Sequence, residues 1–183
     1  MARVHELRAG PLTDAAFRPF GQVIEAKDRA PDFRGASGTQ GWAIDYQAGR
    51  TRVMLLQTPY LGLGFKTMER HFELTQTFIP LGGSPAVVAV AAPTDRGDRA
   101  ALPRPEDVRA FLLDGTKGYA LGKGAWHRLD RFPLAPPDTR FVILTDEETA
   151  ADLDLAYAGT GGWRLTQEVD FEASLGVTFR FVL

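Results

Sequence analysis

Short apolar segments separated by turn-forming residues make up most of the chain. From Gln22 onward, runs rich in Val, Ile, Leu, Phe and Thr alternate with Gly, Pro and Asp, which is the pattern of an all-β sandwich or barrel. The segments predicted to be strands are Arg52–Thr58, Gly64–Phe72, Gln76–Leu81, Ala86–Ala92, Val108–Asp114, Ala125–Phe132, Arg140–Thr145, Asp152–Tyr157 and Gly176–Val182. The pattern therefore predicts an all-β fold.

One segment near the start differs, because it predicts a short helix. Thr13 can cap a helix over Asp14–Phe20. The stretches Lys27–Gly41 and Ala92–Glu106, with their Pro, Gly and Asp residues, predict surface loops rather than linkers. Since the chain has 183 residues and no repeat of fixed period, we interpret it as one domain over residues 1–183.

Composition narrows the kinds of ligand and compartment. The chain has 21 Lys and Arg against 23 Asp and Glu, a formal net charge of −2, which gives no basic surface for nucleic acid or an anionic membrane. It has no cysteine, so only His, carboxylate or amide oxygen could hold a metal. The N-terminal segment carries charges where a signal peptide is apolar, and no run approaches the ~18 apolar residues of a membrane span. These features predict a cytoplasmic protein that binds a small neutral or anionic molecule.

The predicted strand Gly64–Phe72 carries the first residues with chemical potential. Alternation places Glu69 and His71 on one face of this strand and Arg70 on the other. A turn then leads into the next predicted strand, and in a hairpin Gln76 would lie beside His71 on the same face. The sequence thus predicts a cluster of three polar side chains at this hairpin.

A glycine-rich segment that ends in Trp126 and His127 is predicted to deliver both residues onto a further strand. The spacing Glu69-x-His71-x4-Gln76, followed later by a Gly-x-x-His that ends in His127, resembles the two-part motif of the cupins. A single strand histidine is more often structural than catalytic, but two of the three histidines of this chain fall on motif positions. His5, in the charged terminal segment, is expected to be a surface residue.

A closer resemblance is to the ureidoglycolate lyase family, whose members are cupin barrels. Three blocks carry it in the same order: Ala16-Phe17-x-x-Phe20-Gly21-x-Val23-Ile24-Glu25, Glu69-Arg70-His71-x4-Gln76-x-Phe78-Ile79-Pro80-Leu81, and Trp126-His127 followed by Pro133-Leu134. The match covers residues 12 to about 145, and the segment beyond it follows no pattern of the family. The resemblance implies a single cupin-type β-barrel (a double-stranded β-helix) that works as a homodimer and cleaves ureidoglycolate to glyoxylate and urea.

Site roles follow from that resemblance and from what the reaction requires. Cleavage of a hemiaminal needs a base and an acid, and histidine suits either role because its ordinary pKa of ~6.5 lies close to cellular pH. The expected catalytic residues are His71, His127 and Glu69, with Glu69 as partner base or as the group that sets the tautomer of a histidine. The expected substrate-binding residues are Gln76, Lys123, Trp126, Tyr119 and Arg70, of which Arg70 and Lys123 are the candidates for the substrate carboxylate.

Several alternatives remain open at this point. No metal is required by the sequence, but His71, Gln76 and His127, together with Glu69, could hold a divalent metal ion as a Lewis acid. Because the amide of Gln76 is neutral, the site would have less negative charge with which to retain a metal ion than a site with a carboxylate at this position. The protein could also be a non-catalytic cupin that binds a small carboxylated ligand, or a metal-dependent cupin isomerase or oxygenase. The large area that an indole buries favours a place for Trp126 in the core or at a dimer interface over a role as a binding platform.

Overall fold

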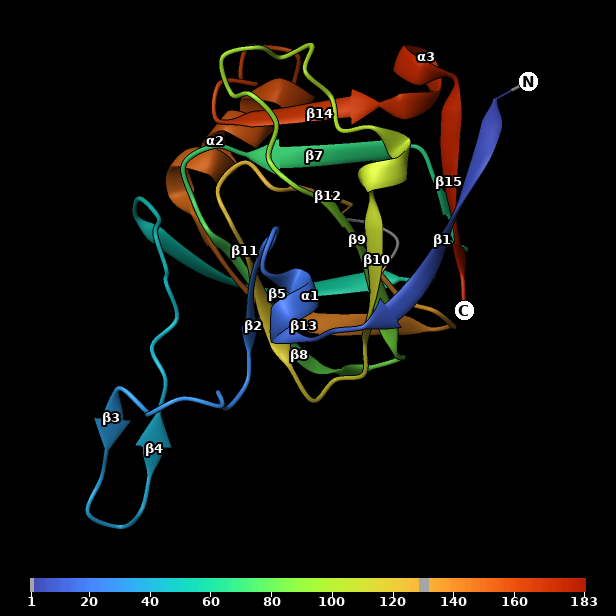
Figure 1. Cartoon of the computed structure of the whole chain (residues 1–183). Coiled ribbons are helices and arrows are strands. Elements are labelled where there is room, and N and C mark those ends of the chain that lie inside the picture. Colours follow the sequence, from blue (N-terminus) through green and yellow to red (C-terminus); the bar gives the residue numbers. More distant parts are fainter. Residues whose placement is uncertain (1, 129–131) are drawn as a thin grey trace.

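Strands dominate the architecture, as the apolar pattern predicts (Figure 1). The computed structural model describes residues 2–128 and 132–183. The strands are β1 (Arg3–Pro11), β2 (Gly21–Ile24), β3 (Phe33–Arg34), β4 (Gln40–Gly41), β5 (Thr51–Pro59), β6 (Gly64–Phe65), β7 (Thr67–His71), β8 (Gln76–Gly83), β9 (Ala86–Ala91), β10 (Arg109–Leu113), β11 (Gly118–Leu121), β12 (Trp126–His127), β13 (Asp138–Asp146), β14 (Thr166–Asp170) and β15 (Val177–Val182). The helices are α1 (Asp14–Phe17), α2 (Glu147–Tyr157) and α3 (Phe171–Leu175), with a 3₁₀ turn at Pro105–Asp107.

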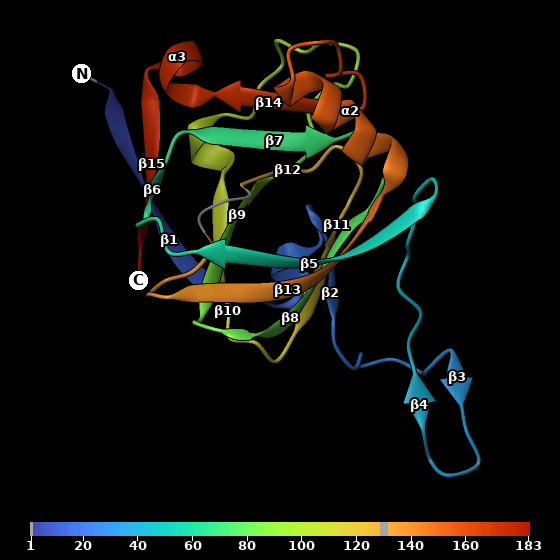
Figure 2. The same ribbon diagram turned by 180° about the vertical axis from the view of Figure 1, so that it is seen from behind.

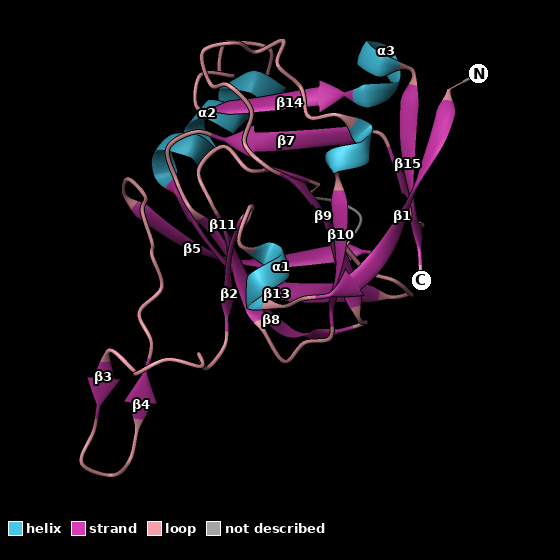
Figure 3. Ribbon diagram, in the orientation of Figure 1, coloured by secondary structure: helices cyan, strands magenta, loops and turns pink. Residues whose placement is uncertain are grey.

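Two sheets curl around a common interior to give the cupin-like all-β fold that the resemblance implies. One sheet has eight strands in the order β14-β7-β12-β9-β10-β1-β15-β6, and the other has five in the order β2-β11-β8-β13-β5. Seen from behind, β5 and β13 run side by side across the second sheet (Figure 2). A small ribbon of β3 and β4 projects away from this body (Figure 3). The functional side chains described below come from the first sheet.

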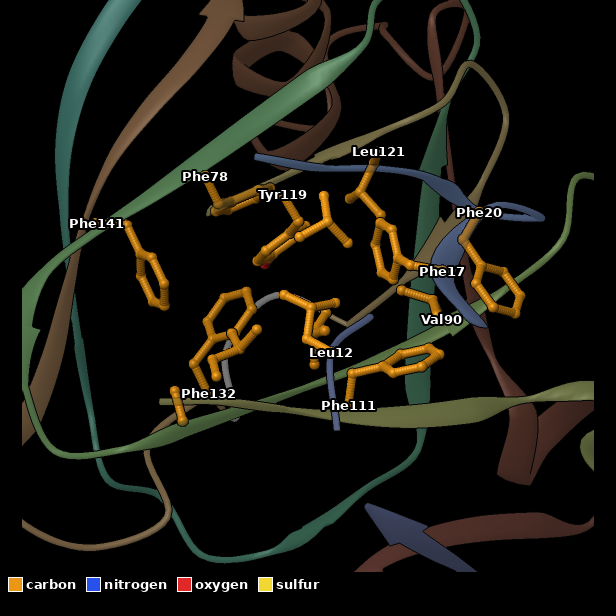
Figure 4. Close-up of a cluster of buried hydrophobic side chains, with 14 of the residues drawn as sticks. Leu12, Phe17, Phe20, Phe78, Val90, Phe111, Tyr119, Leu121, Phe132 and Phe141 are labelled. Carbon is orange, nitrogen blue, oxygen red and sulfur yellow. The ribbon is translucent and has the colours of Figure 1, made fainter. Parts of the chain in front are cut away.

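Strand β9 shows how the two sheets share their packing. It is buried on both faces, so its alternate side chains enter two different apolar clusters. Val88 and Val90 face the barrel interior, where Phe78 and Tyr119 pack (Figure 4). The residues that alternate with them, Val87, Ala89 and Ala91, belong to a second cluster. This cluster also contains Met68, Trp126, Phe171 of α3 and Phe179 of β15. Any residue paired with β9 is therefore assigned to the interior or to the outer cluster by its register.

The predicted strand Asp152–Tyr157 is wrong, because these residues form the second half of α2. The side chain of Asp146 caps the helix by accepting the Thr149 N–H, and acidic residues fill the first turn, where the helix dipole favours them. The alternating pattern of this segment suggests a strand, but the helix begins at the cap six residues earlier. Farther upstream, the cap at Thr13 is confirmed, although α1 ends at Phe17 rather than Phe20.

Other boundaries also differ from the sequence expectation. The predicted strand Ala125–Phe132 is confirmed only at β12, since Leu129–Arg131 lie outside the described residues. The sequence pattern missed β1, in which charged residues alternate with apolar ones and only Leu7 is buried. It also missed β11, where the glycine-rich segment was expected to turn but pairs with both β2 and β8. Among the described helices, none is long and apolar enough to cross a membrane.

A buried carboxylate ties α2 to the start of β14. Asp152 accepts the backbone N–H groups of Arg164, Leu165 and Thr166 at 3.1, 2.9 and 3.2 Å. Hydrogen bonds to a charged acceptor contribute more than neutral ones, and their buried donors are costly to leave unpaired. We therefore expect Asp152→Ala to lower the free energy of unfolding by about 2–4 kcal/mol, measured by urea denaturation.

Asp154→Ala is the matched control, because Asp154 lies on the same helix but is exposed. Equal losses in the two variants would mean that the Asp152 contacts do not hold the segment.

Candidate active site

Two strands bring the predicted catalytic residues Glu69, His71 and His127 together. Glu69 and His71 lie on β7, and His127 lies on β12, directly opposite Glu69 in the antiparallel pair. Oε1 of Glu69 is 3.3 Å from Nε2 of His127 and 3.5 Å from Nε2 of His71. The two imidazole centroids are 5.1 Å apart. All three side chains are almost fully buried, with exposed fractions of 1–3%.

Register explains why these three side chains face the barrel interior. His127 is also opposite Val90 of β9, which belongs to the interior cluster. Since paired residues in an antiparallel sheet point to the same face, Glu69 and His71 point inward as well. The sequence prediction that Glu69 and His71 share a face is confirmed by this arrangement.

Hydrogen bonds at Nδ1 orient both imidazoles. Nδ1 of His127 lies 3.2 Å from the carbonyl oxygen of Ala125, which can only accept, so Nδ1 carries the proton. Nδ1 of His71 lies 2.9 Å from Oγ1 of Thr166, its partner across the β7–β14 pair. A hydroxyl can donate or accept, so this contact allows either tautomer of His71. The Nε2 atoms of both rings are thereby directed at Glu69.

The three converging atoms have no hydrogen-bond partner within the described part of the chain. These atoms are Oε1 of Glu69 and Nε2 of His71 and His127, and all three are shielded from solvent. In a neutral His127 with its proton on Nδ1, the lone pair of Nε2 would face a carboxylate oxygen, which is repulsive. A proton or a cation between the groups removes this repulsion. The site is therefore built to hold one or the other.

The charge state of Glu69 follows from its surroundings. Burial by itself would raise the pKa of its carboxyl, but the contacts with His127 and His71 outweigh burial and lower the pKa to about 2. Glu69 is therefore ionised at neutral pH. A buried carboxylate without a compensating charge would be very unfavourable, which is a second reason to expect a proton or cation at the imidazoles.

These residues also fit a divalent metal ion. One ligand atom from each of Glu69, His71 and His127 lies within 4.8 Å of the others. Two imidazole nitrogens and a carboxylate oxygen are a donor set suited to Zn²⁺ and other first-row metals. The group that the geometry brings together thus contains the carboxylate Glu69, which supplies the negative charge that the amide of Gln76 lacks.

The predicted hairpin that would place Gln76 beside His71 does not form. Strand β7 pairs with β12 and β14, whereas β8 pairs with β11 and β13 in the other sheet. Phe72 and Leu74, both buried, carry the chain between the two sheets instead of allowing a tight turn. Gln76 is buried opposite Leu121, and its Oε1 has no hydrogen-bond partner among the described residues.

Arg70 and Trp126, expected to bind substrate, lie on the opposite face of the sheet from the histidines. Arg70 is fully buried, and Nε and Nη2 donate to Oε1 of Gln167 at 3.1 and 2.8 Å. Its guanidinium also lies over the Trp126 ring at 4.6 Å, and both side chains bond to Oγ1 of Thr94. This cluster packs β7 and β12 against β14 and the loop that follows β9.

The remaining predicted binding residues lie in two other settings. Tyr119 is buried in the barrel core, where its ring stacks on Phe78 at 4.9 Å and burial raises the pKa of its hydroxyl. Lys123 is exposed in the turn before β12. His5 is only half-buried, with its ring edge against Phe179 at 5.9 Å. None of these side chains contacts the Glu69–histidine group in the contacts described.

A cavity of about 310 Å³ adjoins the Glu69–histidine group at Glu69 and His127. Its lining consists of Thr67, Met68, Glu69, His127, Arg128, Tyr157 and Glu168. The sequence reasoning missed Arg128, Tyr157 and Glu168. Arg128 could have been noticed because it directly follows His127, and Glu168 because Thr166–Asp170 alternates as a strand does. Tyr157 lies at the end of a helix that was predicted to be a strand.

Comparison with known proteins identifies the family of this chain. A profile of the ureidoglycolate lyase family matches residues 4–165. The ureidoglycolate lyase of Azotobacter vinelandii is 33% identical over 125 residues, which cover 64% of this chain and 72% of that protein. Ureidoglycolate lyase 1 of Rhizobium meliloti is 35% identical over 138 residues, which cover 67% of this chain and 73% of that protein. The chain therefore belongs to the ureidoglycolate lyase family.

Proposed function

We propose that this chain is a ureidoglycolate lyase, an enzyme that cleaves ureidoglycolate to glyoxylate and urea. The observation that carries the proposal is the buried group of two imidazoles around one ionised carboxylate, beside a cavity, in a chain of this family. A buried charged group with a perturbed pKa beside a cavity is typical of sites that move protons or bind cations.

The reaction needs one base and one acid. The central carbon of ureidoglycolate carries a hydroxyl, a carboxylate and a nitrogen of urea. Cleavage removes the hydroxyl proton, forms the carbonyl of glyoxylate and breaks the C–N bond, whose electron pair stays on nitrogen. That nitrogen then takes up a proton, so the protons balance and no water is consumed.

The tautomers suggest how the two histidines divide these roles. His127 holds its proton on Nδ1, so its Nε2 is the base that takes the hydroxyl proton. His71, whose Thr166 partner can donate or accept, delivers a proton from Nε2 to the leaving nitrogen. Glu69 lies within 3.5 Å of both Nε2 atoms and stabilises the positive charge as it forms on one ring and leaves the other.

A bound divalent metal would be held by Glu69, His71 and His127, and would polarise the hydroxyl and carboxylate oxygens of the substrate as a Lewis acid. The three side chains would then act by fixing the position of the substrate oxygens. Elemental analysis of the purified protein, with turnover measured before and after chelation, distinguishes this form from the metal-free one.

Turnover of racemic ureidoglycolate tests the proposed activity directly. We expect glyoxylate and urea to appear in equal amounts and faster than in a solution without protein. Urea must be measured as well as glyoxylate, because release of ammonia in place of urea would indicate hydrolysis of the ureido group. Release at the spontaneous rate would contradict the proposal.

We also propose that the enzyme is a cytoplasmic homodimer, as the sequence led us to expect. Support for a dimer comes from the outer face of the five-stranded sheet, where Val53, Leu55 and Leu81 are about 60% exposed. These residues lie on β5 and β8, on either side of β13. Apolar side chains grouped on one face of a sheet are typical of protein interfaces. Light scattering of the purified chain measures the oligomeric state.

A further inference from the structure

A second carboxylate lies next to Glu69 at the cavity. Glu168 on β14 is directly opposite Glu69 on β7, so the two side chains share a face of the sheet. Like charges in this position destabilise a sheet. The imidazoles offset the charge of Glu69, whereas Glu168 accepts a hydrogen bond from the hydroxyl of Tyr157 at 3.2 Å. Packing alone does not require a second acid at this position.

Arg128 also lines this cavity. It follows β12, and its Nη1 donates to the backbone oxygen of Thr67 at 3.2 Å and to the Thr67 hydroxyl. Strands β12 and β14 flank β7, so their backbones are roughly 10 Å apart. The backbones of Arg128 and Glu168 thus lie on either side of β7, and both residues line the cavity.

Glu69 and His127 line the same cavity as these two charges. Oε1 of Glu69 and Nε2 of His127 are buried atoms that have no hydrogen-bond partner within the described ranges, and both residues line this cavity. A ligand held between Arg128 and Glu168 would therefore present its middle atoms to the base and the carboxylate. The cavity thus combines a cation, two groups suited to proton transfer and an anion.

This combination of groups matches the chemistry of a ureido acid. A guanidinium binds a carboxylate through two parallel N–H donors. A ureido group has the shape of a guanidinium and presents two N–H donors on one edge, so a carboxylate can accept both. We propose that Arg128 binds the substrate carboxylate and that Glu168 binds the ureido edge, which rests on the proposed function. The hydroxyl-bearing carbon then lies between them, over Glu69 and His127.

Binding of two uncleaved probes separates the two ends of the site. Oxalurate has both a carboxylate and a ureido group but no hydroxyl proton to lose, and glyoxylate has only the carboxylate end. We expect Arg128→Gln to raise the Kd of both probes by about tenfold or more, measured by calorimetry. Glu168→Gln should raise the Kd of oxalurate by about tenfold and leave that of glyoxylate within about twofold.

Two further variants control for indirect effects. Glu172→Gln removes an exposed carboxylate on α3 that bonds Lys66 and does not line the cavity, so it should change neither Kd. Arg128→Lys keeps the positive charge but lacks the paired N–H donors of the guanidinium, so it should bind both probes more weakly than wild type. This variant replaces Arg128→Gln in the test if Arg128→Gln does not fold. Thermal melting shows whether each variant is folded.

Failure of the inference can be told from failure of the function. Unchanged Kd values in the Arg128 and Glu168 variants, or an equal loss for both probes in Glu168→Gln, would overturn the inference even if wild type releases urea. Oxalurate binding with the expected pattern, but without turnover of ureidoglycolate, would remove the lyase activity and leave a ureido-acid site. A wild-type protein that binds neither probe overturns the inference.

Discussion

Replacing His127 with alanine should lower kcat for ureidoglycolate by about 10³-fold, because the variant lacks the base that takes the hydroxyl proton. The same change should lower the free energy of unfolding by about 2–4 kcal/mol, since the ring donates a hydrogen bond to Ala125 and contacts the buried Glu69 carboxylate. Steady-state turnover and urea denaturation of the same preparation measure the two effects. His71→Ala should behave in the same way.

His5→Ala is the matched control for both histidine variants, because His5 lies on β1 away from the cavity. Its rate should equal that of wild type. If the two site histidines act as one unit, the double variant should be little slower than either single one. Wild-type rates in His71→Ala or His127→Ala would mean that the site lies elsewhere.

Glu69→Gln should also lower kcat strongly, by about 10²–10³-fold, because the amide has the same shape but cannot stabilise a charged imidazole. Its effect on stability should depend on pH. The folded pKa of Glu69, about 2, is below its ordinary value of 4.5, so its ionisation stabilises the fold above pH 4.5. This contribution, of the order of a few kcal/mol, is lost as the pH falls from 4.5 towards 2.

Denaturation at pH 6 and at pH 3 checks the pH dependence. The difference in unfolding free energy between wild type and Glu69→Gln should shrink at the lower pH. A difference that is the same at both pH values would show that folding does not lower the pKa of the Glu69 carboxyl. The exposed Glu172→Gln variant serves again as the control, because its carboxylate lies outside the catalytic group.

The alternating pattern predicted the local geometry of the site, but not its partners across the sheet. Alternation within β7 correctly placed Glu69 and His71 on one face and Arg70 on the other. The pairing of His127 with Glu69 depends on register between distant strands, which periodicity does not contain. Only the resemblance to a known motif connected these two segments before the structure did.

The errors have a common physical cause, which is that tertiary contacts decided between local options. A hairpin from His71 to Gln76 is a reasonable local structure, yet buried Phe72 and Leu74 send the chain to the other sheet. Arg128 and Glu168 were not recognised because neither stands in a motif, and only the fold places them at one cavity.

Strand β14, in the last part of the chain, contributes to the site as well as to stability. Thr166, which orients His71, and Glu168, at the cavity, both lie on β14, and Asp152 fastens that strand to α2. The family profile ends at residue 165, just before these positions. If Glu168 binds the ureido edge as proposed, the residue that recognises this end of the substrate lies outside the matched region, whereas Glu69, His71 and His127 lie within it. Exchanging the C-terminal stretch between relatives offers a way to redirect such an enzyme to other ureido acids without rebuilding its barrel.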